Sequence, residues 1–288
     1  MPLSLARPKH RLAFDPEVGG LAALGIERPE QLLGDEGFAI ARAEAVASLI
    51  RGVRLRFPLP GTARGPGGRL TGRPAGSATG WVVLERFRGS SWRELLAARL
   101  THPRSASLAE RRWNLLCHLR ACGVGTPEPL AVGARGEGPV SRDSFLVTRE
   151  LEGFEPLGTW LAREHGPRER RRGLRALAAF LAALFGARVR LPRLAAEQLR
   201  ISAEEGSCSL RASPVPAGLV RNRMPSVVLT EVDGGEIRDA PSASDLRALL
   251  CAVVEGEPSL TAKERAQLAV RSLRAFPPAF RRDVLAAR

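Results

Sequence analysis

The chain has 288 residues, 44% of them hydrophobic and 26% charged, which is typical of a globular protein with a sizeable buried core. The formal net charge is +14, and arginine carries almost all of it, because Lys9 and Lys263 are the only lysines. The longest apolar stretch, 176–185, is far too short to span a bilayer and so excludes a membrane helix there.

The first half of the chain predicts strands with two longer helices, after a loosely ordered lead, 1–35. In the segment 46–57, apolar residues alternate with arginines, as on a half-exposed strand. The segment 58–80 is rich in Gly, Pro and Arg, and we predict a flexible insertion there. The expected elements are a short helix at 29–33, strands at 38–40, 46–57, 81–87 and 144–149, a turn and a strand over 125–132, and helices at 91–100 and 107–122.

The second half predicts mainly helices. A long amphipathic helix is expected over 168–185, where leucines recur at helical spacing. A polar insertion, 204–226, precedes a buried strand, and two helices follow with Ser244 and Thr261 as expected N-caps. The order indicates an α+β fold with two lobes, a β-rich N-lobe at 36–152 and a helical C-lobe at 153–288. The remaining expected elements are a hinge and helix start at 153–160, the strand at 227–232 and helices at 245–254 and 261–273.

The cysteines and the N-terminal segment indicate a cellular compartment. No Cys-x-x-Cys pair occurs, so neither a zinc site nor a disulfide framework is expected. Cys117 and Cys122 fall in an apolar helical pattern, and we expect both thiols to lie in the core. Residues 1–14 lack an apolar run of signal-peptide length. We therefore expect a cytoplasmic protein, with peripheral association at the inner membrane face left open.

Several segments resemble the lipopolysaccharide kinase family, bacterial enzymes that phosphorylate Kdo or heptose in the lipid A–core. The resemblance covers roughly 36–275 and implies a protein-kinase-like fold. Val83-Leu84-Glu85-Arg86-Phe87-Arg88 with Trp92 resembles the family's Leu-Lys-Arg-Phe strand and the helix after it. The other matching segments are the helix from Glu110 to Leu116 with its exit at Gly123 and Thr126-Pro127, the strand Ser144-Phe145-Leu146-Val147-Thr148, and Ser244-Asp245-Leu246.

The resemblance also implies which functional positions have changed. Glu85 stands where the family's strand carries the lysine that clamps the phosphates of ATP, and a carboxylate there would repel them. Glu110 would be the acidic partner on the following helix, so this pair would be like-charged. Arg193 stands where the catalytic loop carries its Asp, and a protonated guanidinium cannot accept the proton of a sugar hydroxyl.

Two further positions concern the metal. By the same resemblance Gln198 occupies the metal-side Asn or His position, and a neutral amide touches a metal only weakly. Glu231 replaces the metal-binding Asp, the mildest change, because a carboxylate can still ligate Mg²⁺. Another register would make Asp233 the ligand, although the family pattern favours Glu231.

These changes favour a pseudokinase, a non-catalytic binding or regulatory protein linked to the cell-envelope glycolipid. The alternative is an active, atypical kinase for a lipopolysaccharide core sugar, with ATP held by Arg86 or Arg88 and Mg²⁺ by Glu231 with Asp233. An unrelated fold that carries these side chains on its surface is a further alternative. An ion pair between Glu85 and Arg193 would fill the nucleotide site.

Possible partners follow from the charge. The arginines suit an envelope glycolipid or an anionic membrane surface, and a pseudokinase suits a protein partner. Nucleic acid is not favoured, because few aromatic residues are interleaved with the arginines. The sequence fixes no oligomeric state.

Overall fold

The computed structural model describes residues 26, 29–33, 44–49, 52–58, 81–89, 107–135, 143–151, 153–191, 194, 196–202, 227–232, 235–237, 242–255, 257–274 and 276–286. The chain divides into two compact units. Unit 1 consists of 1–114 with 128–152, and unit 2 consists of 115–127 with 153–288.

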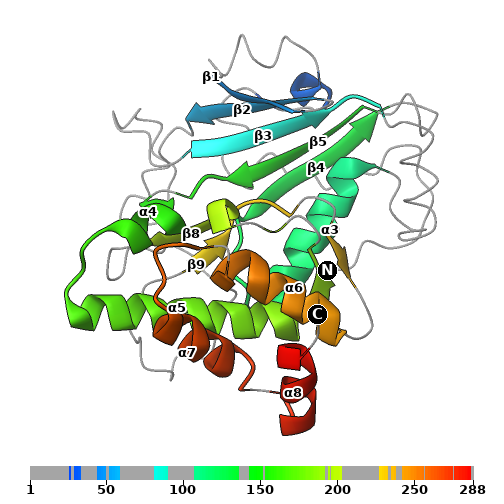
Figure 1. The fold of residues 1–288 in the computed structure, drawn as a ribbon. Helices are drawn as coiled ribbons and strands as arrows, with labels where there is room; N and C mark the ends of the chain where they lie inside the picture. Colours follow the sequence, from blue (N-terminus) through cyan, green and yellow to red (C-terminus); the bar gives the residue numbers. More distant parts are fainter. Residues whose placement is uncertain are drawn as a thin grey trace, which may run out of the picture. The chain divides into compact units, whose positions relative to one another are not determined.

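Unit 1 is built on a five-stranded antiparallel sheet with the order β1-β2-β3-β5-β4 (Figure 1). The predicted strands at 81–87 and 144–149 are confirmed. The single strand predicted over 46–57 is wrong, because two antiparallel strands occupy it and the alternating pattern belongs to the second alone. The strands are β1 (Glu44–Leu49), β2 (Gly52–Pro58), β3 (Trp81–Phe87), β4 (Pro129–Arg135) and β5 (Asp143–Arg149).

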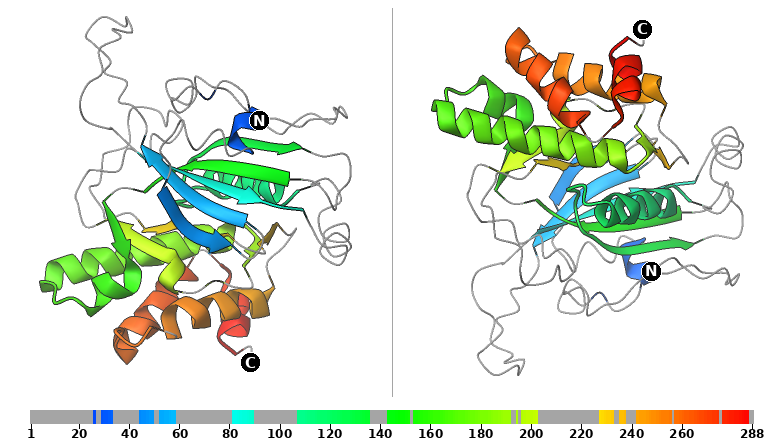
Figure 2. Two further views of the ribbon diagram at one scale, coloured as in Figure 1. Left: turned by 90° about the horizontal axis from the view of Figure 1, so that it is seen from above. Right: turned by 90° about the horizontal axis from the view of Figure 1, so that it is seen from below.

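The two faces of this sheet have different coverings (Figure 2). One face packs its apolar side chains against Ile26 and the 3₁₀ helix η3 (Pro29–Leu32), which confirms the short helix predicted there. The other face meets the first half of helix α3 (Leu108–Ala121), the predicted helix of 107–122. The core of the first face comprises Ile26, Leu32, Leu55, Phe57, Val82, Leu84, Leu130, Ala131, Phe145 and Val147.

Unit 2 is mainly helical. Its longest helix, α5 (Pro167–Gly186), confirms the amphipathic helix predicted over 168–185 and buries leucines along one side. A three-stranded sheet, β6-β8-β9, and a two-stranded sheet, β10-β7, complete the unit. The other elements are β6 (Phe154–Pro156), α4 (Leu157–Ala162), β7 (Val189–Arg190), η4 (Ala196–Gln198), β8 (Leu199–Ser202), β9 (Val227–Leu229), β10 (Glu236–Ile237), α6 (Ala243–Leu250), the π-helical turn η5 (Cys251–Glu255), α7 (Ala262–Ser272) and α8 (Pro278–Ala286).

The N-caps of two helices test the predicted start signals. Thr261 caps α7 and forms a full capping box with Glu264, as expected. Ser244 is not the cap of α6. Ser242 takes that place and accepts a hydrogen bond from the Asp245 backbone, so the helix begins two residues earlier than the sequence pattern indicated. None of the helices in the described part of the chain is both long and apolar enough to cross a membrane.

A half-buried arginine ties three segments of unit 2 together. Arg170 of α5 donates to both carboxylate oxygens of Glu264, at 2.8 and 3.2 Å, and to the carbonyls of Leu161 and Ser259, at 2.6 and 2.9 Å. These bonds join α5 to the end of α4 and the start of α7. The hydrogen bond from Arg170 lowers the pKa of the Glu264 carboxyl from 4.5 to about 2.

Stability should therefore fall in acid. A carboxyl whose pKa is lower in the folded chain stabilises the fold above its unfolded pKa, and this contribution is lost as the pH falls from 4.5 toward 2. After allowance for solvent screening we expect a loss of about 1–2 kcal/mol. Arg170→Met should remove about 2–4 kcal/mol at neutral pH and flatten this acid dependence. Urea unfolding at several pH values measures both effects.

The neighbouring arginine provides the matched control. Arg171 is exposed and donates to the Pro167 carbonyl of its own helix, at 3.0 Å. Arg171→Met should change the free energy of unfolding by less than about 0.5 kcal/mol. Equal effects of the two substitutions would contradict the role assigned to Arg170.

Candidate functional site

The carboxylate of Glu85 lies at the centre of a charge cluster in unit 1. Glu85 is the fifth residue of β3, and only 7% of its surface is exposed. Arg54 stands directly opposite on β2, and its Nε donates to Glu85 Oε1 at 2.8 Å. Arg112 of α3 donates to the other oxygen, Oε2. Two guanidinium groups from two different elements therefore hold one buried carboxylate.

The position of Arg112 depends on how α3 begins. Ser107 and Glu110 form a reciprocal cap, because the Glu110 backbone donates to Ser107 Oγ at 3.2 Å and the Ser107 backbone donates to Glu110 Oε2 at 3.0 Å. Arg112 follows within the next turn, and its guanidinium carbon also lies 4.9 Å from the centre of the Phe87 ring. The cap and this stacking hold Arg112 toward β3.

This geometry corrects two expectations for unit 1. Glu110 does not form a like-charged pair with Glu85, since Glu110 caps its own helix and α3 presents Arg112 to β3 instead. Arg86 cannot hold ATP on the face where Glu85 lies, because successive strand residues point to opposite faces of the sheet. The Arg86 Nε donates to the Leu32 carbonyl at 2.6 Å, on the face that η3 covers. Arg88 is exposed just beyond the end of β3.

Unit 2 brings together two of the predicted metal-side residues. Gln198 Nε2 lies 3.5 Å from Glu231 Oε2. The backbone explains this proximity, since β8 and β9 pair just beyond Gln198 and just before Thr230. The Thr230 backbone and hydroxyl both donate to the Gln198 carbonyl, at 2.8 and 2.9 Å. The amide and the carboxylate are thus held at one end of a short antiparallel pair.

A close approach of backbones fixes the other side of β9. The Leu229 backbone donates to the Gly125 carbonyl at 2.9 Å. A Cβ atom on Gly125 would lie 2.6 Å from the Val227 carbonyl oxygen, closer than real contacts allow. Glycine at 125 is therefore needed for the strand that leads to Glu231 to sit where it does.

Arg193 and Asp233 lie outside the described residues, so their predicted roles stay predictions. Leu191 and Leu194 on either side of Arg193 are buried. Among the described residues, no group of three or more His, Cys, Asp or Glu side chains could hold a metal ion. Gln198 and Glu231 alone would offer one amide and one carboxylate.

The sequence reasoning missed Arg54 and Arg112. The sequence did contain a sign of each residue's place. Arg54 alternates with apolar residues in β2, and Arg112 lies in the stretch that resembles the family's helix. What the sequence lacked was the register of β2 against β3, which places Arg54 opposite Glu85. The helix phase that turns Arg112 rather than Glu110 toward the strand was also missing.

The strand order, the helix over one face of the sheet and the helical second unit define an α+β, protein-kinase-like fold. A solved structure described as WaaP in complex with acyl carrier protein supports it. That structure aligns with a TM-score of 0.62 and 18% identity over 96% of this chain and 92% of the other.

Comparison of sequences shows which family part of the chain resembles. The model of the lipopolysaccharide kinase (Kdo/WaaP) family matches residues 63–191. The lipopolysaccharide core heptose(I) kinase WaaP of Escherichia coli is 34% identical over 68 residues, which are 24% of this chain and only 26% of that protein. Residues 63–191 are thus similar to the lipopolysaccharide kinase (Kdo/WaaP) family, over somewhat less than half of the chain.

Proposed function

We propose that this chain is a pseudokinase of the lipopolysaccharide kinase family, a non-catalytic binding or regulatory protein linked to the cell-envelope glycolipid. The ion pairs of Glu85 carry the proposal. In the related strand a lysine would hold the phosphates of ATP. Here a carboxylate takes that place by resemblance, and both of its oxygens are engaged by Arg54 and Arg112.

The reversed polarity has a structural consequence. In an active kinase the strand lysine pairs with a glutamate of the following helix, and the pair must be in place for catalysis. In this chain the acid is on β3 and the base is on α3, so the pair that links strand and helix is kept with its signs exchanged. Such a pair holds α3 against β3, and it engages the guanidinium group of Arg112 with a carboxylate instead of a nucleotide phosphate. This suits a scaffold that keeps the kinase shape.

The proposed loss of catalytic residues extends to the catalytic loop and the metal site. Arg193 in place of the base, and Gln198 with Glu231 in place of stronger metal ligands, would together remove the base and weaken metal binding. Phosphoryl transfer depends on positioning and electrostatic stabilisation, so combined losses at these positions leave little catalytic power. We therefore expect these positions to hold ATP with Mg²⁺ poorly.

A protein partner is the second element of the proposal. One solved structure with the same fold is a complex of WaaP with acyl carrier protein. We propose that this chain likewise acts through a bound protein, beside an envelope glycolipid or an anionic membrane surface. A net charge of +14 favours both kinds of acidic partner.

Nucleotide binding tests the proposal. ATP with Mg²⁺ at ten times a dissociation constant would stabilise a true binder by about 1.4 kcal/mol, a rise of roughly 3–6 °C in Tm. We expect a rise of less than about 1 °C, because Glu85 disfavours the phosphates. Thermal unfolding with ATP alone, Mg²⁺ alone and both together separates the contributions.

One observation favours the alternative, an active atypical kinase for a lipopolysaccharide core sugar. The Gln198 amide and the Glu231 carboxylate lie together, as the metal-side residues of a kinase would. A Mg²⁺-dependent rise in Tm that Glu231→Ala abolishes would support this alternative and contradict the pseudokinase. Glu164→Ala, which removes an exposed carboxylate between α4 and α5, is the control and should leave any such rise unchanged.

A further inference from the structure

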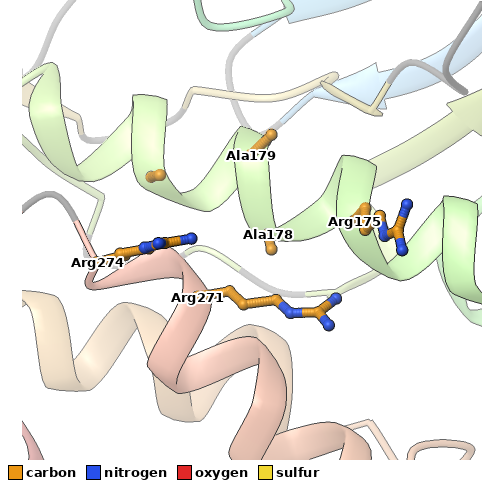
Figure 3. A pocket seen from close by; sticks show the side chains of 6 residues that line it. Arg175, Ala178, Ala179, Arg271 and Arg274 are labelled. Atoms are coloured by element: carbon orange, nitrogen blue, oxygen red, sulfur yellow. The ribbon is translucent and has the colours of Figure 1, made fainter.

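A hollow of about 390 Å³ lies in unit 2 between α5 and the end of α7 (Figure 3). Its lining is of only two kinds. Three arginines surround it, and three alanines of α5 form the rest of its wall. The lining residues are Arg175, Ala178, Ala179, Ala182, Arg271 and Arg274.

The spacing of these residues explains why they converge. Arg175, Ala178, Ala179 and Ala182 stand at positions i, i+3, i+4 and i+7 of α5 and share one face of the helix. Arg271 lies in the last turn of α7 and Arg274 follows three residues later. Figure 3 shows the Arg271 and Arg274 side chains extending from the end of α7 into the space beside α5, with Arg175 at its edge.

The arginines of the hollow differ from those that hold the fold together. Arg54, Arg112 and Arg170 are bonded to carboxylates. Within the described part of the chain, the side chains of Arg175, Arg271 and Arg274 make no hydrogen bond or ion pair, and the hollow has no acidic residue in its lining. Three like charges gathered around one hollow repel each other, so no interaction among the described residues accounts for their placement.

We propose that this hollow binds a phosphate monoester, separately from the residues that correspond to the kinase site. A phosphate monoester presents three oxygens and about two negative charges, and guanidinium groups bind such oxygens in a bidentate manner. Several arginines can therefore share one phosphate. A single carboxylate has only two oxygens and one charge, so three unpaired arginines exceed what it needs. The alanines leave room for the neutral part of the ligand.

The hollow itself can be filled without changing charge. Ala179 is exposed on α5, and leucine is nearly as good a helix former as alanine. Ala179→Leu should keep the fold and occupy the space in front of the guanidinium groups. It provides a variant that tests the shape of the site independently of its charge.

The experiment uses the full chain and two sources of the same chemistry. Glycerol 3-phosphate is the soluble probe, and phosphatidylcholine vesicles that contain phosphatidic acid present the same group on a surface. Isothermal titration measures the first and vesicle co-sedimentation the second. We expect Arg271→Gln with Arg274→Gln to weaken binding at least ~10-fold, and Ala179→Leu to weaken it as well.

A matched double variant removes the same charge elsewhere. Arg168 and Arg282 are exposed arginines outside the hollow, and Arg168→Gln with Arg282→Gln should change binding less than about twofold at physiological salt. If the substitutions in the hollow weaken binding of both probes, the hollow is a phosphate site open to soluble ligands. If they weaken binding to vesicles alone, its ligand is a lipid head group. Equal losses in the two double variants, or no binding of either probe, would overturn the proposal. The proposal would also be overturned if the hollow bound an acidic peptide but neither probe, because the hollow would then be a protein-binding surface.

Discussion

Replacing Glu85 with lysine, the residue that the family resemblance expects in this strand, should lower the free energy of unfolding by about 3–5 kcal/mol. The substitution would place three cations together, since Arg54 lies opposite on β2 and Arg112 reaches across from α3. The Glu85 side chain is 9% exposed, so water screens this repulsion poorly. Urea unfolding measures the loss, and hydrogen exchange in β3 shows where it occurs.

Two further variants make this prediction specific. Glu85→Lys combined with Arg112→Glu restores an opposite pair and should recover at least half of the lost stability. Glu150 pairs with Arg56 at 2.6 Å near the same sheet, but the two side chains are 26% and 34% exposed. Glu150→Lys should therefore cost only about 1 kcal/mol. A stable Glu85→Lys variant that binds ATP would contradict both the predicted cost and the role of the Glu85 ion pairs in the pseudokinase proposal.

Much of the fold could be predicted from the sequence because local patterns are strong where side chains are buried. The apolar run of β3 and the leucine periodicity of α5 gave both elements with bounds correct to within one residue. These patterns report burial directly, and burial is what keeps the elements in place. The resemblance to the lipopolysaccharide kinases then supplied the arrangement that periodicity alone cannot give.

The errors have local physical causes. β1 and β2 were joined into one strand because an apolar residue count does not locate a reversal of the chain. Cys117 and Cys122 were expected in the core, and both are exposed. Apolar residues occur on more than one side of α3, so composition did not identify its buried face. Leu115, Leu116 and Leu119 define that face in the structure.

The candidate site was only half predictable for a related reason. Resemblance identifies positions such as Glu85 and Glu231, but the partners of a changed residue follow from register and helix phase. Arg112 became the partner of Glu85 because α3 begins at the Ser107–Glu110 cap and turns its next arginine toward β3. A family pattern describes the unchanged pair, so it directed attention to Glu110 instead.

Substituting alanine for Gly173 should destabilise unit 2 by about 2–3 kcal/mol, although alanine normally stabilises a helix interior by about 1 kcal/mol. A Cβ atom on Gly173 would lie 2.0 Å from Cη2 of Trp160 and 2.6 and 2.7 Å from two more atoms of the same ring. Trp160 is 1% exposed and its ring stacks on His165, at 4.1 Å between ring centres. Because the indole is buried and stacked on one face, we expect α4 and α5 to separate to accommodate the new Cβ atom.

The same helix contains its own control. Gly186 ends α5, and a Cβ atom there would meet nothing within 4 Å. Gly186→Ala should therefore be neutral or stabilising by up to about 1 kcal/mol. Trp160→Leu removes the clashing ring, so Gly173→Ala should cost much less in that background, and a double-mutant cycle by urea unfolding measures the coupling. Additive effects would contradict the clash, and would mean that α4 and α5 can adjust their spacing around residue 173.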